Sequence, residues 1–226
     1  MIYFVIISVL LIMSFLIVAS FRIDWGIYVR SYCREKREGE RSIMITFDDG
    51  PHPENTSKVL DLLKEKNVKA LFFLIGEKAI DNPQVVRRIA DEGHLIGIHS
   101  LRHTPEFTIA SKRRVKNDLI ATKKILEELS GKEIKLFRPP FGVTNPSIGR
   151  AVRELGLVSV GWSIRSFDTV ASSDIEKVMK RVRKGLHNGA ILLLHDRLPL
   201  SSLLLKEILD YLDNQGYEAK LFSKVL

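Results

Sequence analysis

Cysteine is almost absent from this chain of 226 residues, which contains only Cys33. A single cysteine excludes an internal disulfide and any cysteine-rich zinc site. The sequence also lacks a block of basic residues interleaved with aromatic ones, because its 35 basic and 27 acidic residues are spread along the chain. We therefore expect no nucleic-acid partner, and nothing in the sequence indicates an obligate protein partner. A content of 45% hydrophobic and 27% charged residues excludes a disordered or collagen-like protein.

Charged residues are missing from the first 21 positions, which form one long apolar run. At about 1.5 Å of rise per residue, a helix of that length crosses a hydrocarbon core of roughly 30 Å. Arg22, Trp25 and Tyr28 follow, and these residue types settle at membrane interfaces. We therefore predict a transmembrane helix or uncleaved signal anchor over residues 1–21. The alternative is a cleaved signal peptide, with Val18-Ala19-Ser20 as the small-residue cleavage site.

Residues 22–41 carry six basic and four acidic side chains. This composition predicts a solvated basic tether between the apolar segment and the rest of the chain. These six basic residues all follow the apolar segment, whereas only the terminal amine precedes it. The positive-inside rule therefore places the folded part in the cytoplasm.

From Ser42 onward, short apolar runs alternate with longer segments of helical period. The alternation predicts an α/β fold with a parallel sheet, either closed into a barrel or open and doubly wound. The expected strands are 43–48, 69–75, 95–99, 134–138, 157–163, 190–195 and 217–222, and the expected helices are 55–66, 83–92, 110–129, 145–155, 174–185 and 201–214.

Ionisable residues gather at the carboxyl ends of five of these expected strands. In parallel α/β folds such ends converge on one rim, whose loops carry the active site. We therefore predict a site at this rim, built from Asp48, Asp49, His99, Arg138, Asp168 and His195.

His99 and His103 are spaced so that two imidazoles can face one cation. A carboxylate from the first strand would complete a two-histidine, one-carboxylate set, which leaves coordination positions open for water and substrate. Such a set suits catalytic zinc and several other divalent ions. The alternative is one half-buried and one exposed histidine without a cation.

The adjacent Asp48 and Asp49 can take separate tasks, one on a cation and one on a proton, or they can form an N-cap or Asx-turn. His195, near a carboxylate such as Asp168, can act as a general acid, or can bond to a local carbonyl. Arg138 can hold a carboxylate bidentately or form a surface pair.

Five segments resemble, in order, the five motifs of the polysaccharide deacetylases, carbohydrate esterase family 4, also called the NodB homology domain. They are Thr46-Phe47-Asp48-Asp49-Gly50-Pro51, His99-Ser100-x-x-His103, Arg138-Pro139-Pro140-Phe141-Gly142, the Trp162–Asp168 segment and Leu193-x-His195. The resemblance covers residues 42–226. It implies a catalytic domain built as a distorted (β/α) barrel of seven or eight parallel strands. It also implies metal-dependent removal of acetyl groups from a glycan such as peptidoglycan, chitin-type or poly-N-acetylglucosamine polymers. N-acetyl groups are expected in preference to O-acetyl groups.

The resemblance also implies a role for each matching residue. The cation would be zinc, with cobalt, manganese, nickel or iron as alternatives. Asp48 would be the catalytic base, Asp49, His99 and His103 the metal ligands, His195 the general acid, Arg138 the partner of Asp48, Asp168 the partner of His195, Leu193 a wall of the acetyl-methyl pocket, and Phe141 a backbone N–H donor to the oxyanion.

The fourth motif departs from the family pattern Asp-x-x-Asp-Trp, because Arg165 and Thr169 replace its first Asp and its Trp. This departure concerns the substrate groove more than the chemistry. Phe141 stands where Tyr is commoner, which leaves the backbone N–H unchanged. The resemblance favours a domain on the outer face of the membrane, whereas the arginines after the helix favour the inner face. Two other functions remain open: a metal-dependent amidase for a small non-carbohydrate substrate, and a membrane-tethered, inactive sugar-binding module.

Overall fold

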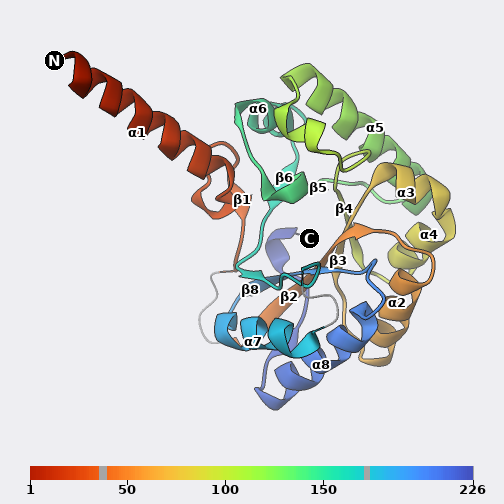
Figure 1. Ribbon diagram of the computed structural model, residues 1–226. Helices are drawn as coiled ribbons and strands as arrows, with labels where there is room; N and C mark the ends of the chain where they lie inside the picture. Colours follow the sequence, from red (N-terminus) through yellow and green to blue (C-terminus); the bar gives the residue numbers. More distant parts are fainter. Residues whose placement is uncertain (36–39, 171–173, 226) are drawn as a thin grey trace.

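Nine parallel strands form the centre of the molecule in the computed structural model, which describes residues 1–35, 40–170 and 174–225 (Figure 1). Eight of them follow the order β1-β6-β5-β4-β3-β2-β8-β7, and β9 pairs with β2. The strands are β1 Ser31–Tyr32, β2 Ser42–Gly50, β3 Leu71–Leu74, β4 Leu95–Ile98, β5 Leu136–Phe137, β6 Val158–Val160, β7 Ile164–Arg165, β8 Ala190–His195 and β9 Glu218–Ala219.

Helix α1 Ile2–Ser20 extends away from the barrel (Figure 1). The other helices lie on the outer side of the sheet and connect its strands; they are α2 Asn55–Glu65, α3 Gly76–Asp81, α4 Pro83–Asp91, α5 Lys112–Ser130, α6 Pro146–Glu154, α7 Ile175–Gly185 and α8 Ser201–Asn214. Short 3-10 turns lie at Ile23–Trp25, Pro105–Ile109, Pro140–Gly142 and Ser223–Val225. The predicted parallel (β/α) barrel is confirmed, although the described residues form nine strands rather than the expected seven or eight. Among the described residues, β1 and β7 stand at the two ends of the strand order and leave the barrel open between them.

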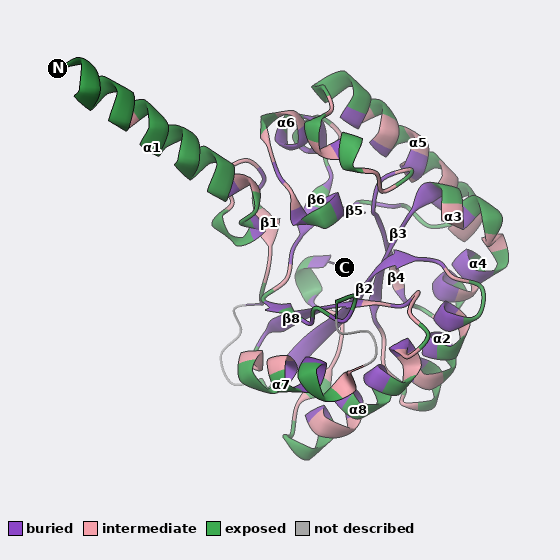
Figure 2. Ribbon diagram, viewed as in Figure 1, coloured by how far each residue is buried: buried purple, intermediate pink, exposed green. Residues whose placement is uncertain are grey.

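Strand β2 is the centre of the core, and all nine of its residues are buried. Alternate side chains point to opposite faces of a strand. Accordingly, Ile43, Ile45 and Phe47 pack in the layer between sheet and helices, while Met44 packs inside the barrel against Phe73 and Ile191. Burial on both faces explains why the strand reads as a nearly continuous apolar run. Figure 2 shows the same separation, with buried residues on the strands and on the inner faces of the helices.

The segment expected to be a solvated tether, residues 22–41, instead packs on the barrel over much of its described part. Strand β1 pairs with β6, and the Glu35 N–H donates to the carbonyl oxygen of Gly189 at 2.8 Å. Ile23 and Val29 are buried. The composition of the segment concealed these contacts, because two-residue strands and single apolar side chains leave no periodic signal. Residues 36–39 of this segment lie outside the described residues.

Several other boundaries differ from the expected ones. The strand expected at 157–163 ends at Val160, and a separate strand, β7, begins at Ile164. Helix α3 was not expected, since its six residues are too few to show a helical period. The expected strand at 217–222 shortens to the two residues of β9.

Candidate active site

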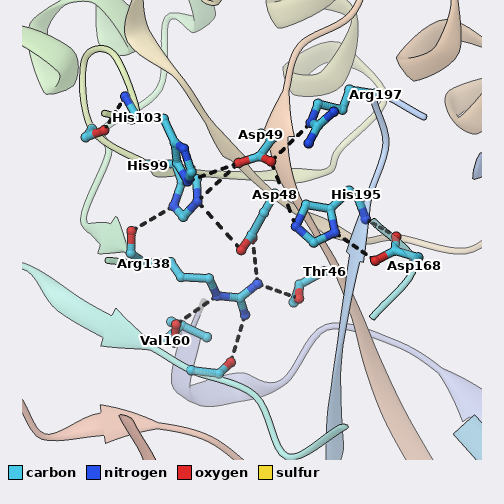
Figure 3. A network of polar contacts seen from close by, with 12 residues as sticks. Thr46, Asp48, Asp49, His99, His103, Arg138, Val160, Asp168, His195 and Arg197 are labelled. Carbon is cyan, nitrogen blue, oxygen red and sulfur yellow. Dashed lines mark hydrogen bonds and ion pairs between the residues drawn. The ribbon is translucent and has the colours of Figure 1, made fainter. Parts of the chain in front are cut away.

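A local irregularity in β2 turns two adjacent carboxylates toward one cavity. Asp48 pairs with Phe73 of β3, but the next pair joins Gly50 to Leu74, so Asp49 is an extra residue. Its φ of 71° lies in the left-handed region. A bulge of this kind re-aims a side chain that would otherwise point to the opposite face of the strand. Both carboxylates therefore reach the rim at the carboxyl end of the sheet (Figure 3).

Asp49, His99 and His103 offer three ligand atoms within 4.8 Å of one another. The Oδ1 atom of Asp49 lies 3.5 Å from His99 Nε2 and 3.3 Å from His103 Nε2. Within the described part of the chain, this buried Oδ1 has no hydrogen-bond partner. A buried, unpartnered carboxylate oxygen facing two imidazoles fits the donor set of a divalent cation. The three residues can thus hold a metal ion.

The protonation states of these three residues suit a cation as well. His99 Nδ1 lies 2.8 Å from the carbonyl oxygen of Arg138, so Nδ1 carries the proton and Nε2 faces the site as a lone pair. Burial, together with the nearby His99, lowers the pKa of His103 to about 4. Burial raises the pKa of Asp49, but the facing rings of His99, His103 and His195 outweigh burial and hold this pKa well below its usual range.

Asp48 lies beside the three ligands and is fixed by Arg138. The fully buried guanidinium donates from Nη1 to Asp48 Oδ1 at 2.7 Å. Asp48 Oδ2 faces the ligands and lies 3.8 Å from His99 Nε2. This arrangement leaves one carboxylate oxygen available for a proton in the site.

His195 reaches the site from β8, whose register places it directly beside Asp48 of β2. Its Nδ1 lies 2.8 Å from Asp168 Oδ1, and its backbone N–H donates to Asp168 Oδ2 at 2.8 Å. Burial lowers the pKa of His195, but the hydrogen bond and charge of Asp168, with the charges of Asp48 and Asp49, outweigh burial and raise it. The ring is therefore favoured in its protonated form, with Nε2 directed toward the site at 3.9 Å from Asp49 Oδ2.

These groups line a cavity of about 290 Å³, here called the rim cavity. Leu193 forms a buried part of its wall, and Phe141 stands at its exposed edge with its ring centroid 4.4 Å from that of His103. Trp162 and Arg165 complete one side. All nine residues predicted from the sequence thus lie in or directly behind one cavity, with Arg138 and Asp168 in the layer behind it.

The backbone around the rim cavity adopts an unusual conformation. Positive φ values occur at Asp49, Ser100, His103, Phe141 and Phe167, which are all non-glycine residues. Such a conformation costs free energy and persists where surrounding contacts enforce it, often at functional sites. At His103, for example, the backbone N–H donates to the Ser100 hydroxyl at 2.9 Å. The two histidines therefore meet through a tight loop turn rather than a helix.

Two cations near Asp49 were missed from the sequence. Arg197 Nε donates to Asp49 Oδ2 at 3.1 Å, and Lys78 Nζ donates to the Asp49 carbonyl oxygen at 2.8 Å. Arg197 follows His195 by two residues, a position that could have suggested it. Lys78 lies on α3, an element that the sequence did not reveal.

The fold and the site together define a class of protein: a parallel (β/α) barrel with a two-histidine, one-aspartate cation site at the carboxyl ends of its strands. The family model for polysaccharide deacetylase matches residues 35–160 of the chain. The chain therefore belongs to the polysaccharide deacetylase family, whose members depend on a metal ion.

Individual relatives agree with this assignment. The peptidoglycan-N-acetylglucosamine deacetylase of Bacillus cereus is 37% identical over 197 residues, which cover 85% of this chain and 91% of that protein. The peptidoglycan-N-acetylglucosamine deacetylase PgdA of Listeria monocytogenes is 38% identical over 184 residues, 81% of this chain but only 38% of the Listeria protein. Among solved structures, a family 4 acetyl xylan esterase from Clostridium thermocellum, in complex with cobalt, superposes with a TM-score of 0.74 at 31% identity, covering 81% of this chain and 89% of that one.

Proposed function

We propose that this protein is a metal-dependent hydrolase that removes acetyl groups from a glycan, and that N-acetyl groups are its preferred substrate. The observation that carries the proposal is the meeting of a cation site with two proton-transfer groups in one cavity. Asp48 and His195 both adjoin the ligand residues, and each is held by its own buried partner. The names of the relatives, which include peptidoglycan and chitooligosaccharide deacetylases, support a glycan such as peptidoglycan, a chitin-type polymer or poly-N-acetylglucosamine.

The metal ligands in this proposal are Asp49, His99 and His103. A divalent cation bound there would polarise the acetyl carbonyl and lower the pKa of water to about 7. Zinc suits the donor set, as do cobalt, manganese, nickel and iron. The cobalt in the Clostridium thermocellum structure supports cobalt as an alternative.

The chain's own groups then supply the proton transfers. Asp48, held through Oδ1, accepts at Oδ2 the proton of the attacking water. The backbone N–H of Phe141 donates to the developing oxyanion of the tetrahedral intermediate, a contribution of about 3–4 kcal/mol for a single donor. Protonated His195 donates from Nε2 to the leaving amine, so that the carbon–nitrogen bond breaks in the forward direction. The Leu193 side chain encloses the acetyl methyl group.

We also propose that α1 anchors the protein in a membrane as a single span, with the domain of residues 42–226 on the outer face. Helix α1 has a mean hydropathy of 2.9 and is exposed along nearly its whole length (Figure 2). The peptidoglycan substrates named for the relatives support the outer face. The basic residues of 22–41 favour the inner one. Fusions of alkaline phosphatase and of green fluorescent protein after Leu226 distinguish the two, because the first is active outside and the second fluoresces inside.

Metal removal tests the hydrolase proposal. We expect full-length protein to release acetate from N-acetylated chitooligosaccharides or peptidoglycan fragments, to lose this activity on chelation, and to regain it with zinc or cobalt. Asp49→Ala and His103→Ala should bind no stoichiometric metal and release no acetate, whereas Asp91→Ala, an exposed site on α4, should match the wild type. Full activity after complete metal removal would refute the proposal.

The choice of acetylated compound separates the alternatives. Acetate release from small non-carbohydrate amides, but not from glycans, would favour the amidase. Sugar binding without turnover of any acetylated compound would favour the inactive binding module.

A further inference from the structure

A second cavity adjoins the rim cavity on the side of the N-terminal helix. It has a volume of about 540 Å³, and its walls include Phe21 and Arg22 at the end of α1, Arg34 after β1, and Trp162 and Arg165 of the β6–β7 region. We call it the membrane-edge cavity. Trp162 and Arg165 line both cavities, so the two share a wall. A ligand lying across Trp162 and Arg165 would therefore contact both cavities.

The membrane-edge cavity carries an excess of positive charge. Its charged groups are the three arginines and Asp24, which pairs with Arg22 at 2.7 Å. Within the described residues, neither Arg34 nor Arg165 forms an ion pair. The Arg165 guanidinium lies 5.7 Å from the Trp162 ring centroid and 4.7 Å from that of Phe167, which holds it between the two cavities. Two arginines are thus available to an anionic ligand.

The end of α1 is attached to the barrel rather than joined to it by a free linker. The Thr144 N–H donates to the Ser20 carbonyl oxygen at 2.8 Å, and the Tyr28 hydroxyl donates to the Leu16 carbonyl oxygen at 3.1 Å. Thr144 follows directly on the loop that brings Phe141 to the rim cavity. In Figure 1, α1 leaves the barrel beside β1 and β6. These contacts fix where the site stands relative to the proposed membrane anchor.

With α1 spanning the membrane as proposed above, this attachment would place the membrane-edge cavity at the depth of lipid phosphates. Phe21 and Arg22 follow the last turn of the apolar helix, where a membrane span emerges into the headgroup region. Arginine is the side chain best suited to phosphate there, because its planar fork donates two parallel hydrogen bonds. This holds on either face of the membrane, since lipid phosphates lie at both.

We propose that the membrane-edge cavity binds the phosphate of a lipid-linked acetylated glycan, through Arg34 and Arg165, while an acetylated sugar of the same molecule occupies the rim cavity. The substrate would then be a membrane-bound glycan carrier rather than a free polymer strand. This inference rests on the proposed deacetylase function and names its substrate class. Arg165 is also where the fourth motif exchanges an acidic residue for a basic one, a change that suits an anionic ligand.

Equilibrium binding tests the cavity independently of catalysis. The ligand is a short-chain prenyl pyrophosphate, which has no acetyl group, and the protein is full-length and in detergent micelles. We expect calorimetry to give a Kd at least tenfold higher for Arg34→Gln/Arg165→Gln than for wild type, with a smaller increase for Arg34→Gln alone. Arg87→Gln, an exposed site on α4, is the matched control and should leave the Kd unchanged. Circular dichroism checks that each variant is folded.

Acetate release then tests whether the phosphate is part of the substrate. Three forms of one N-acetylated disaccharide are compared: linked to the short prenyl chain by pyrophosphate, linked to the same chain by a neutral ether, and free. We expect kcat/KM to be at least tenfold higher for the pyrophosphate form than for either other form. In the double variant this preference should fall about tenfold, mainly through KM.

The outcomes separate this inference from the proposed function. Equal prenyl pyrophosphate affinity in wild type and double variant overturns the inference, as does equal kcat/KM on the pyrophosphate and ether forms. Phosphatidylglycerol that displaces prenyl pyrophosphate at equal concentration also overturns it, because the cavity would then be a lipid-headgroup site. If no form releases acetate while binding still depends on the two arginines, the deacetylase function fails and the phosphate site stands.

Discussion

Arg138 Nη1 donates to Asp48 Oδ1 at 2.7 Å, and both side chains are buried. The same guanidinium donates to the Thr46 hydroxyl and to the carbonyl oxygens of Val160 and Gly161. A buried charge is tolerated only when it is paired and hydrogen-bonded in this way. The pair therefore stabilises the fold as well as the site, because the guanidinium holds the proposed base and also links β2 to β6 through hydrogen bonds inside the barrel.

Removing only the cation from this pair should strongly destabilise the protein. Arg138→Met leaves the buried Asp48 carboxylate without its partner, so we expect the free energy of unfolding to fall by about 3–5 kcal/mol. Urea denaturation of the full-length protein in detergent measures this. Arg150→Met, at an exposed position on α6, is the matched control and should change the value by less than about 0.5 kcal/mol. Adding Asp48→Asn to Arg138→Met should recover part of the loss, and no recovery would show that the charge pair is not the cause.

Asp48→Asn alone should separate metal binding from turnover. The amide keeps the size of the carboxylate and lies outside the three-ligand set, so we expect metal content to remain near wild type. Since it can no longer accept a proton, kcat should fall by about 100-fold or more. Elemental analysis and acetate release measure the two effects. Asp91→Asn supplies the control. Wild-type turnover in Asp48→Asn would show that Asp48 is not the catalytic base. Loss of the metal would indicate that Asp48 is itself a metal ligand.

The sequence predicted which residues form the site, but not the backbone geometry that brings them together. Asp48, His99 and His195 could be placed at one rim, because the carboxyl ends of parallel strands converge whatever the loops do. The bulge that turns Asp49 into the cavity could not be predicted, since it depends on a register shift between β2 and β3. Arg197 and Lys78 were missed because their contacts with Asp49 depend on loop and helix positions that carry no pattern.

The N-terminal region shows the same division between pattern and contact. The apolar run of α1 is long enough to be read directly from composition. The attachment of residues 22–35 to the barrel depends on single backbone hydrogen bonds, such as the one from Glu35 to Gly189, and on the two residues of β1. Such contacts are decided by tertiary packing, so a charged composition suggested a tether where the structure has a docked segment.

Asp168→Asn should move the alkaline limit of the reaction to lower pH. His195 acts as an acid, so turnover falls as pH rises through the pKa of His195. Asp168 contributes to raising that pKa, and a neutral amide removes its charge. We expect the alkaline limb of the kcat profile to shift to lower pH by about one unit or more. Asp174→Asn preserves the N-cap of α7 away from the site and should leave the profile unchanged. An unmoved limb would assign it to another group.

His94 should make the folded state sensitive to acid through a group outside the site. Burial lowers its pKa to about 4, from 6.5 in the unfolded chain, and its Nδ1 accepts a hydrogen bond from the Ala70 N–H. Because the folded pKa is the lower one, this stability is complete above pH 6.5 and is lost as pH falls toward 4. From pH 7 to pH 5 the loss should be about 2 kcal/mol.

His94→Asn keeps an acceptor for the Ala70 N–H but cannot titrate, so its free energy of unfolding should decline less over this pH range. Urea denaturation at pH 7, 6 and 5 measures the slope. The control is His187→Asn, the same exchange at a partly buried imidazole between α7 and β8, which should keep the wild-type slope. Equal slopes in wild type and His94→Asn would show that other groups cause the acid sensitivity.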